Sequence, residues 1–154
     1  MVKRLTDMPE VEANHLRRIA CPTYDDTPPL SGKPLRERRV AIISTAGLHR
    51  RSDRAFRPGD GSYRVIPGET PANELVMSHI SVNFDRTGFQ QDLNVVFPID
   101  RLRELSADGA VGSMASVHYS FMGAFPPDAA NPHAQHLAGL LKADKVDAVL
   151  LVPV

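Results

Sequence analysis

Three histidines of this chain lie within or just after short apolar runs, where an imidazole could take part in chemistry. They are His49, His79 and His118. An imidazole titrates near neutral pH, so it can move a proton or bind a metal ion. The wide separation of the three matches no compact metal motif, and we predict no metal site. A structural histidine held by hydrogen bonds stays an open interpretation, above all for His79.

Two arginines directly follow His49 and could bind an anion. Guanidinium groups hold carboxylates through paired, charge-assisted hydrogen bonds. Arg50 and Arg51 therefore predict a place for a small carboxylate. A basic loop that is only solvated is the alternative interpretation, and the sequence does not decide between the two.

Another polar segment precedes a predicted helix and is long for a loop. It contains Asp85, Arg86, Asp92 and Asn94. Loops of this length are either functional or cover the edge of a sheet. We favour function, because the carboxylates could orient a histidine or a cationic group of a substrate.

Tyr119 and Ser120 follow His118 at another expected edge of the site. Neither Ser120 nor Ser78, which precedes His79, lies in the glycine-flanked turn of a serine hydrolase, so we do not predict that class. No glycine-rich phosphate loop follows the first predicted strand either, which removes the usual reason to expect a dinucleotide.

The elements that must position these residues can be predicted from hydrophobic patterns. Strands are predicted over 40–46, 63–66, 75–82, 111–117 and 146–154. Helices are predicted within 1–20, over 98–105 after Pro98, and from Asn131 onward as the cap. Strands and helices alternate in the second half, which predicts an α/β fold. Its three layers would be a mostly parallel, Rossmann- or flavodoxin-like sheet with flanking helices.

The predicted organisation is an N-terminal helix and proline-rich lead-in over 1–37, followed by the α/β domain over 38–154. The last predicted strand is very apolar, and we expect it in the interior of the sheet. The chain stops inside it, whereas natural termini usually lie in exposed segments. We therefore expect the domain to continue beyond Val154.

Composition limits the class of protein further. The chain has 18 basic and 18 acidic residues, so we predict neither nucleic acid nor a membrane surface as a partner. Its single cysteine, Cys21, excludes an internal disulfide framework and a thiolate zinc cluster. No signal peptide or stretch of about 20 apolar residues is present. These features predict a soluble cytoplasmic protein.

Six segments, taken together and in order, resemble the selenoprotein B component of the glycine, sarcosine, betaine and D-proline reductases. They are 43–49, 63–67, 78–79, 92–102, 118–123 and 147–154. The resemblance implies an oxidoreductase subunit that cleaves the C–N bond of a small amino acid or betaine. It also implies other reductase subunits as possible partners, one of them carrying a pyruvoyl group.

In that family a selenocysteine, or a cysteine in its place, follows the strand that corresponds to the end of this chain. Its selenolate attacks the substrate carbon and displaces the amino group, leaving a selenoether. The resemblance therefore implies a UGA codon after Val154, no cofactor within these residues, and an inactive 154-residue chain.

By this resemblance we assign supporting roles to residues near the nucleophile. The catalytic support would come from His79, Asp92, Asn94 and His118, and substrate binding from His49, Arg50, Arg51, Tyr119 and Ser120. Two hypotheses of other classes remain open. One is a non-enzymatic domain that binds a small carboxylate or docks a partner, and the other is a metal-dependent enzyme built on the three histidines.

Overall fold

The computed structural model describes residues 4–19, 23, 30–81 and 85–154. Cys21 and most of the proline-rich lead-in lie outside these residues. The chain divides into two compact units, Met1–Leu30 and Ser31–Val154. The sequence placed the boundary seven residues later, after residue 37.

The first unit contains one short helix, as predicted. A 3-10 turn, η1 (Leu5–Asp7), precedes α1 (Glu10–Arg17). Glu10 and Glu12 lie in the first turn of α1 and Arg17 in its last, which suits the helix dipole. Among the described residues of this helix, only Ala13 is buried.

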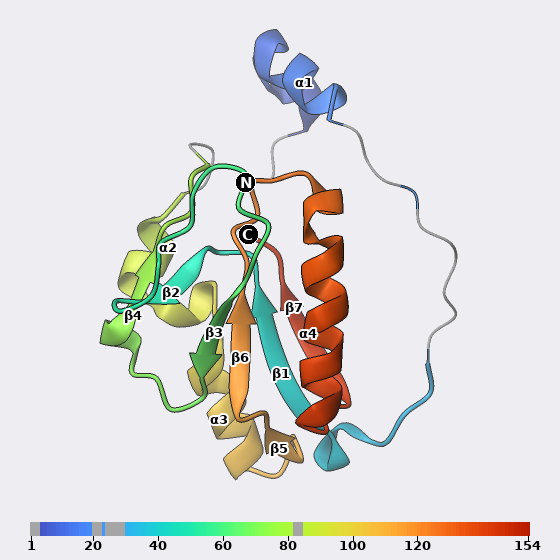
Figure 1. The fold of residues 1–154 in the computed structure, drawn as a ribbon. Helices are drawn as coiled ribbons and strands as arrows, with labels where there is room; N and C mark the ends of the chain where they lie inside the picture. The colour runs from blue at the N-terminus through green and yellow to red at the C-terminus, as the bar shows by residue number, and fades with distance from the viewer. Residues whose placement is uncertain (1–3, 20–22, 24–29, 82–84) are drawn as a thin grey trace. The chain divides into compact units, whose positions relative to one another are not determined.

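The second unit is built on a mostly parallel sheet. Its strands are β1 (Arg39–Ser44), β3 (Arg64–Pro67), β5 (Ser113–Met114), β6 (Val117–Ser120) and β7 (Ala148–Val152). β1 pairs in parallel with β5, β6 and β7, whereas β3 pairs antiparallel with β6. In Figure 1, β6 in orange lies between β3 in green and β1 in cyan. The predicted α/β class is confirmed.

A separate antiparallel ribbon lies outside this sheet. It consists of β2 (Leu48–Arg50), which the sequence did not predict, and β4 (Leu75–Met77). The predicted strand over 75–82 thus ends at Met77, and Val82 lies outside the described residues. Because of this ribbon and the antiparallel β3, the predicted Rossmann- or flavodoxin-like arrangement is not confirmed.

Both predicted helices of the second unit form. They are α3 (Ile99–Ala107) and α4 (Asn131–Ala143); a shorter α2 (Thr87–Gln91) was not predicted. The N-cap of α4 is Ala130, so the prediction of Asn131 as the cap was wrong by one residue. The 3-10 turns are η2 (Leu35–Glu37), η3 (Ala72–Glu74), η4 (Leu93–Val95) and η5 (Pro127–Ala130). No helix of the described residues is both long and apolar enough to span a membrane.

Alternate residues of β1 join two hydrophobic clusters. Val40 and Ile42 belong to a cluster that includes Leu102 of α3. Ile43 packs against a second cluster that includes Leu137 of α4. This alternation follows from the two-residue period of a strand. The parallel pairing of Ile43 with Tyr119 places the carboxyl end of β1 beside that of β6.

Two predicted strands differ from the structure in ways that matter for the site. The strand predicted over 111–117 is interrupted between β5 and β6, and His118 to Ser120 lie within β6 rather than after it. Among the described residues β7 pairs with β1 alone, so it lies at an edge, contrary to prediction. Leu151 on β7 is 68% exposed.

Candidate functional site

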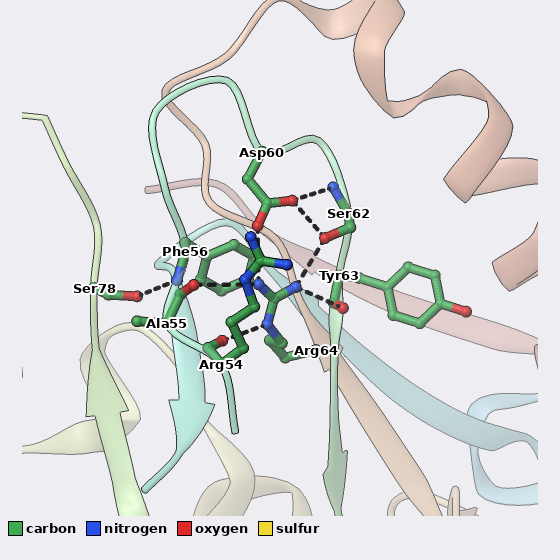
Figure 2. A network of polar contacts seen from close by, with 8 residues as sticks. All are labelled: Arg54, Ala55, Phe56, Asp60, Ser62, Tyr63, Arg64 and Ser78. Carbon is green, nitrogen blue, oxygen red and sulfur yellow. Dashed lines mark hydrogen bonds and ion pairs between the residues drawn. The ribbon is translucent and has the colours of Figure 1, made fainter. Parts of the chain in front are cut away.

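Phe56 lies at the centre of a polar cluster on the loop between β2 and β3. The guanidinium carbon of Arg64 lies 4.1 Å from the centroid of the Phe56 ring, and the ring of His49 lies edge-on at 6.4 Å. The backbone N–H of Phe56 donates to Oγ of Ser78 over 3.0 Å, as Figure 2 shows. The structure therefore brings His49 and Ser78, both noted in the sequence, to one buried phenylalanine.

Arg64 stabilises this loop through several hydrogen bonds. Its Nε donates to the carbonyl of Arg54 (2.8 Å), and its Nη1 donates to Oγ of Ser62 (2.8 Å). Its Nη2 donates to Oδ2 of Asp60 (2.9 Å), and Figure 2 shows all of these bonds converging on one guanidinium. The Arg64 side chain is only 12% exposed. Its charge therefore serves chiefly to order the loop.

The carboxylate of Asp60 is ionised by this arrangement. Burial by itself would raise the pKa of Asp60, but hydrogen bonds from Ser62 and Arg64 outweigh it and lower the pKa below its usual value. The backbone N–H of Ser62 also donates to Oδ1 of Asp60 over 3.0 Å. Asp60 and Arg64 thus form a paired frame with little net charge.

An open cavity of about 420 Å³ lies on this frame, lined mainly by Arg54, Arg57, Pro58, Asp60, Ser62 and Arg64. Arg54 and Arg57 are exposed. Their guanidinium groups form no hydrogen bond or ion pair with any residue that the structure describes. Sequence reasoning recorded this segment only as a loop. The sequence nevertheless contains a signal for this cavity. Two arginines three residues apart precede the turn-forming segment Pro58-Gly-Asp-Gly-Ser-Tyr-Arg64.

The predicted carboxylate-binding pair is already engaged within the chain. Arg50 donates from Nε and Nη2 to the carboxylate of Asp53, at 3.1 and 2.9 Å. The hydrogen bond from Arg50 is the largest cause of the lowered pKa of Asp53. Arg51 donates from Nε to the carbonyl of Asn73 over 2.9 Å. A carboxylate at Arg50 would have to compete with Asp53.

His49 is held by a hydrogen bond from its ring. The residue is 5% exposed, and its Nδ1 lies 2.8 Å from the carbonyl of Arg50, so Nδ1 carries a hydrogen and donates. Its Nε2 is buried, and among the described residues it has no hydrogen-bond partner.

His79 lies against the turn that joins β1 to β2. Its Nδ1 accepts from the backbone N–H of Ser81 (3.2 Å), and Arg86 donates to the carbonyl of His79. Burial, followed by the positive charge of Arg86, lowers the pKa of His79. The φ of Gly47 is 68°, and a Cβ atom there would lie 2.9 Å from the backbone nitrogen of His79. His79 is therefore neutral at physiological pH and tightly placed.

The residues of β6 have structural contacts. The backbone N–H of Ile42 donates to Nδ1 of His118 over 2.9 Å, in place of a bond to the interrupted strand β5–β6. Burial is the largest cause that lowers the pKa of His118 to about 4. Oγ of Ser120 accepts from the N–H of Leu48 over 2.8 Å. Tyr119 packs at 5.5 Å from the ring of Tyr63.

Asp92 and Asn94 connect η4 to the start of α3. Oδ1 of Asp92 accepts from the backbone N–H of Asn94 (2.9 Å). Oδ1 of Asn94 in turn accepts from the N–H of Asp100 (3.0 Å). The pKa of Asp92 is lowered chiefly by the backbone hydrogen bond from Asn94. These contacts stabilise the turn before α3. The supporting catalytic role of Asp92 and Asn94 remains a prediction.

No three or more histidine, cysteine or acidic side chains meet as a possible metal site in the part of the chain that the structure describes. His49, His79 and His118 lie on β2, after β4 and in β6, each with a different backbone partner. The hypothesis of a metal-dependent enzyme receives no support from this arrangement.

Comparison with known proteins places the chain in a family. The family model of the glycine/sarcosine/betaine reductase selenoprotein B matches residues 22–154. The D-proline reductase subunit gamma of Acetoanaerobium sticklandii is 35% identical over 122 residues, which cover 77% of this chain and 50% of that protein. No solved structure matches the chain significantly.

Two further relatives carry related names. The glycine reductase complex component B subunit gamma of Carboxydothermus hydrogenoformans is 28% identical over 145 residues, or 90% of this chain and 33% of the relative. The sarcosine reductase complex component B subunit beta of Peptoclostridium acidaminophilum is 28% identical over 107 residues, or 66% of this chain and 24% of the relative. The chain thus spans half or less of the length of these relatives. It belongs to the glycine/sarcosine/betaine reductase selenoprotein B family, as its sequence motifs indicated.

Proposed function

We propose that this chain forms part of a reductase subunit that cleaves the C–N bond of a small amino acid or betaine. The single observation that carries the proposal is the family match over residues 22–154. The names of the relatives, which are components of D-proline, glycine and sarcosine reductases, support a role beside other subunits. A cytoplasmic location stays a prediction.

As the family resemblance implies, we propose that the nucleophile is a selenolate supplied from outside residues 1–154; the single thiol within these residues is Cys21. A selenolate would form a C–Se bond as the C–N bond breaks. The electron pair of the C–N bond would leave with the nitrogen, which takes up a proton. A thiol reductant would then supply two electrons to release the product from the selenoether.

Within the chain, His49 is proposed to support substrate binding, as the family resemblance implies. Its ring lies 6.4 Å from that of Phe56 on the arginine-rich loop, and its buried Nε2 has no hydrogen-bond partner among the described residues. Arg50 and Arg51 keep their proposed contact with the substrate carboxylate, with Arg50 shared between that carboxylate and Asp53.

Two measurements on the natural gene and protein test the nucleophile directly. The gene is sequenced beyond the codon for Val154, and selenium is measured in the protein isolated from its own organism. We expect a UGA codon read in frame and selenium in the protein. A UAA or UAG codon together with a selenium-free protein would remove the nucleophile. That result would favour the non-enzymatic domain that binds a carboxylate or docks a partner.

A further inference from the structure

The cavity between Arg54 and Arg64 differs in charge from the chain as a whole. The sequence has as many basic as acidic residues. In the cavity, Asp60 is offset by Arg64 at 2.9 Å, and this leaves the positive charges of Arg54 and Arg57 uncompensated by the residues that line it. Arginine charges that face a common cavity attract an anion, and their attraction is strongest at low salt.

The loop that carries these two arginines is held in shape before any ligand binds. Arg64 donates to the carbonyl of Arg54 at one end of the loop, and Ser62 donates to Asp60 near the other. A Cβ atom at position 61 would lie 2.6 Å from the carbonyl oxygen of Ala129. The tip of the loop therefore packs directly against η5. A site ordered in advance loses less entropy when a ligand binds.

The two guanidinium groups define the chemistry of the ligand. A guanidinium presents its N–H donors in a planar fork that matches two oxygens of a carboxylate or of a phosphate. A cavity of about 420 Å³ is of the size that small ligands occupy. The oxyanion would lie against Arg54 and Arg57, on the side of the loop where Asp60 is already neutralised.

We propose that the cavity on loop 54–64 is a binding site for a small oxyanion, a carboxylate or a phosphate, which Arg54 and Arg57 bind and which Arg64 and Asp60 position indirectly. This inference does not rest on the proposed reductase function. It assigns to Arg54 and Arg57 a role that the sequence assigned only to Arg50 and Arg51.

Calorimetric titration of the intact chain with inorganic phosphate, and separately with glycine and betaine, tests this site. The test variant is Arg54→Ala/Arg57→Ala. The matched control is Arg36→Ala/Arg101→Ala, which removes the same charge from two arginines whose side chains are 69% and 61% exposed. A third variant, Arg54→Lys/Arg57→Lys, keeps the charge and removes the fork.

We expect the test variant to bind at least one probe at least tenfold more weakly, as lost charged hydrogen bonds require, while the control binds as the unchanged chain does. The lysine variant should lie between them. Binding of phosphate alone would assign the site to a tetrahedral oxyanion, and binding of glycine or betaine to a carboxylate. No binding of any probe, or equal losses in test and control variants, would overturn the proposal.

Discussion

His118 illustrates how a histidine that looks catalytic in the sequence serves the backbone. It is fully buried, and it accepts the N–H of Ile42 that an unbroken strand would have bound. Protonation of Nδ1 would remove this acceptor and place a charge in the core. The neutral ring is therefore part of the folded state, which gives stability a defined dependence on pH.

We predict that stability falls as the pH drops from about 6.5 to about 4, the ordinary and folded pKa values of His118. In this window the unfolded chain binds a proton that the folded chain does not, so unfolding is favoured by up to about 3 kcal/mol. Above pH 6.5 the contribution is fully present. Urea denaturation at several pH values checks it.

The variant His118→Asn separates this effect from the other histidines, because its Oδ1 takes the place of Nδ1, can still accept from Ile42 and does not titrate. The slope of stability against pH between 4 and 6.5 should be shallower in His118→Asn than in the unchanged chain. Equal slopes in both proteins would mean that His118 is not held neutral.

Gly47 permits the close approach of the β1–β2 turn to His79. Its φ of 68° is in the left-handed region, and a Cβ there would lie 2.9 Å from the backbone nitrogen of His79. We predict that Gly47→Ala destabilises the fold by about 1–3 kcal/mol in chemical denaturation. Gly139→Ala is the control: apart from its chain neighbours and the nearby backbone of α4, no atom lies within 4 Å of the added Cβ, so it should stabilise slightly. Equal effects of both changes would contradict the account.

At the scale of the element, the loop between β2 and β3 depends on the planar fork of Arg64. Lysine keeps the charge, but its three N–H donors diverge from one nitrogen. Arg64 reaches the carbonyl of Arg54, Ser62 and Asp60 from three separate nitrogens of a planar fork, a geometry that lysine cannot reproduce. We predict that Arg64→Lys lowers the free energy of unfolding by about 1–3 kcal/mol and speeds hydrogen exchange in the loop. Arg101→Lys, on the surface of α3, should change neither quantity. An unaltered loop in Arg64→Lys would show that charge alone orders it.

The strand β7 exposes an apolar edge in the described part of the chain. Leu150 and Leu151 are 43% and 68% exposed, and exposed apolar edges promote strand pairing between molecules. We predict concentration-dependent self-association in sedimentation, reduced by Leu151→Lys. The control Leu105→Lys, at a residue 45% exposed on α3, should not reduce it. A chain that stays monomeric at all concentrations would contradict this expectation.

Elements with a strong local pattern were predictable from the sequence, whereas the bounds and pairing of the shortest elements were not. The strand β1 and the helices α3 and α4 have enough residues to show a hydrophobic period. The strands β2 and β4 have three residues each, too few for a period. The strand β2 was therefore missed and β4 was predicted too long, and their pairing depends on contacts far apart in the sequence.

The candidate site was predictable in part for the same reason. His49 was identified because it follows an apolar run. The role of Arg64 was missed because it arises only when the loop folds back to bring Arg54, Asp60 and Phe56 around one guanidinium. The ion pair between Arg50 and Asp53 fits their spacing of three residues in the sequence. The same spacing fits a solvated basic loop equally well, so the sequence could not distinguish the two.

At the scale of the whole molecule, the family match supports a subunit of a reductase complex, and the chain spans half or less of the length of the matched relatives. The family match covers residues 22–154, and the matched relatives are at least twice as long as their aligned part. The α/β unit described here contributes a buried imidazole and an arginine-rich cavity. The nucleophile and the partner subunits belong to the proposal.

The measurement that tests the central claim most directly is a reductase assay of the native complex that contains this chain, isolated from its own organism. The complex is incubated with a dithiol reductant and with glycine, sarcosine, betaine or D-proline in turn, and the products of C–N cleavage are quantified. The account predicts reductive cleavage of at least one of these substrates, abolished when the selenolate is alkylated beforehand. A complex that contains the intact chain and cleaves none of them would contradict it.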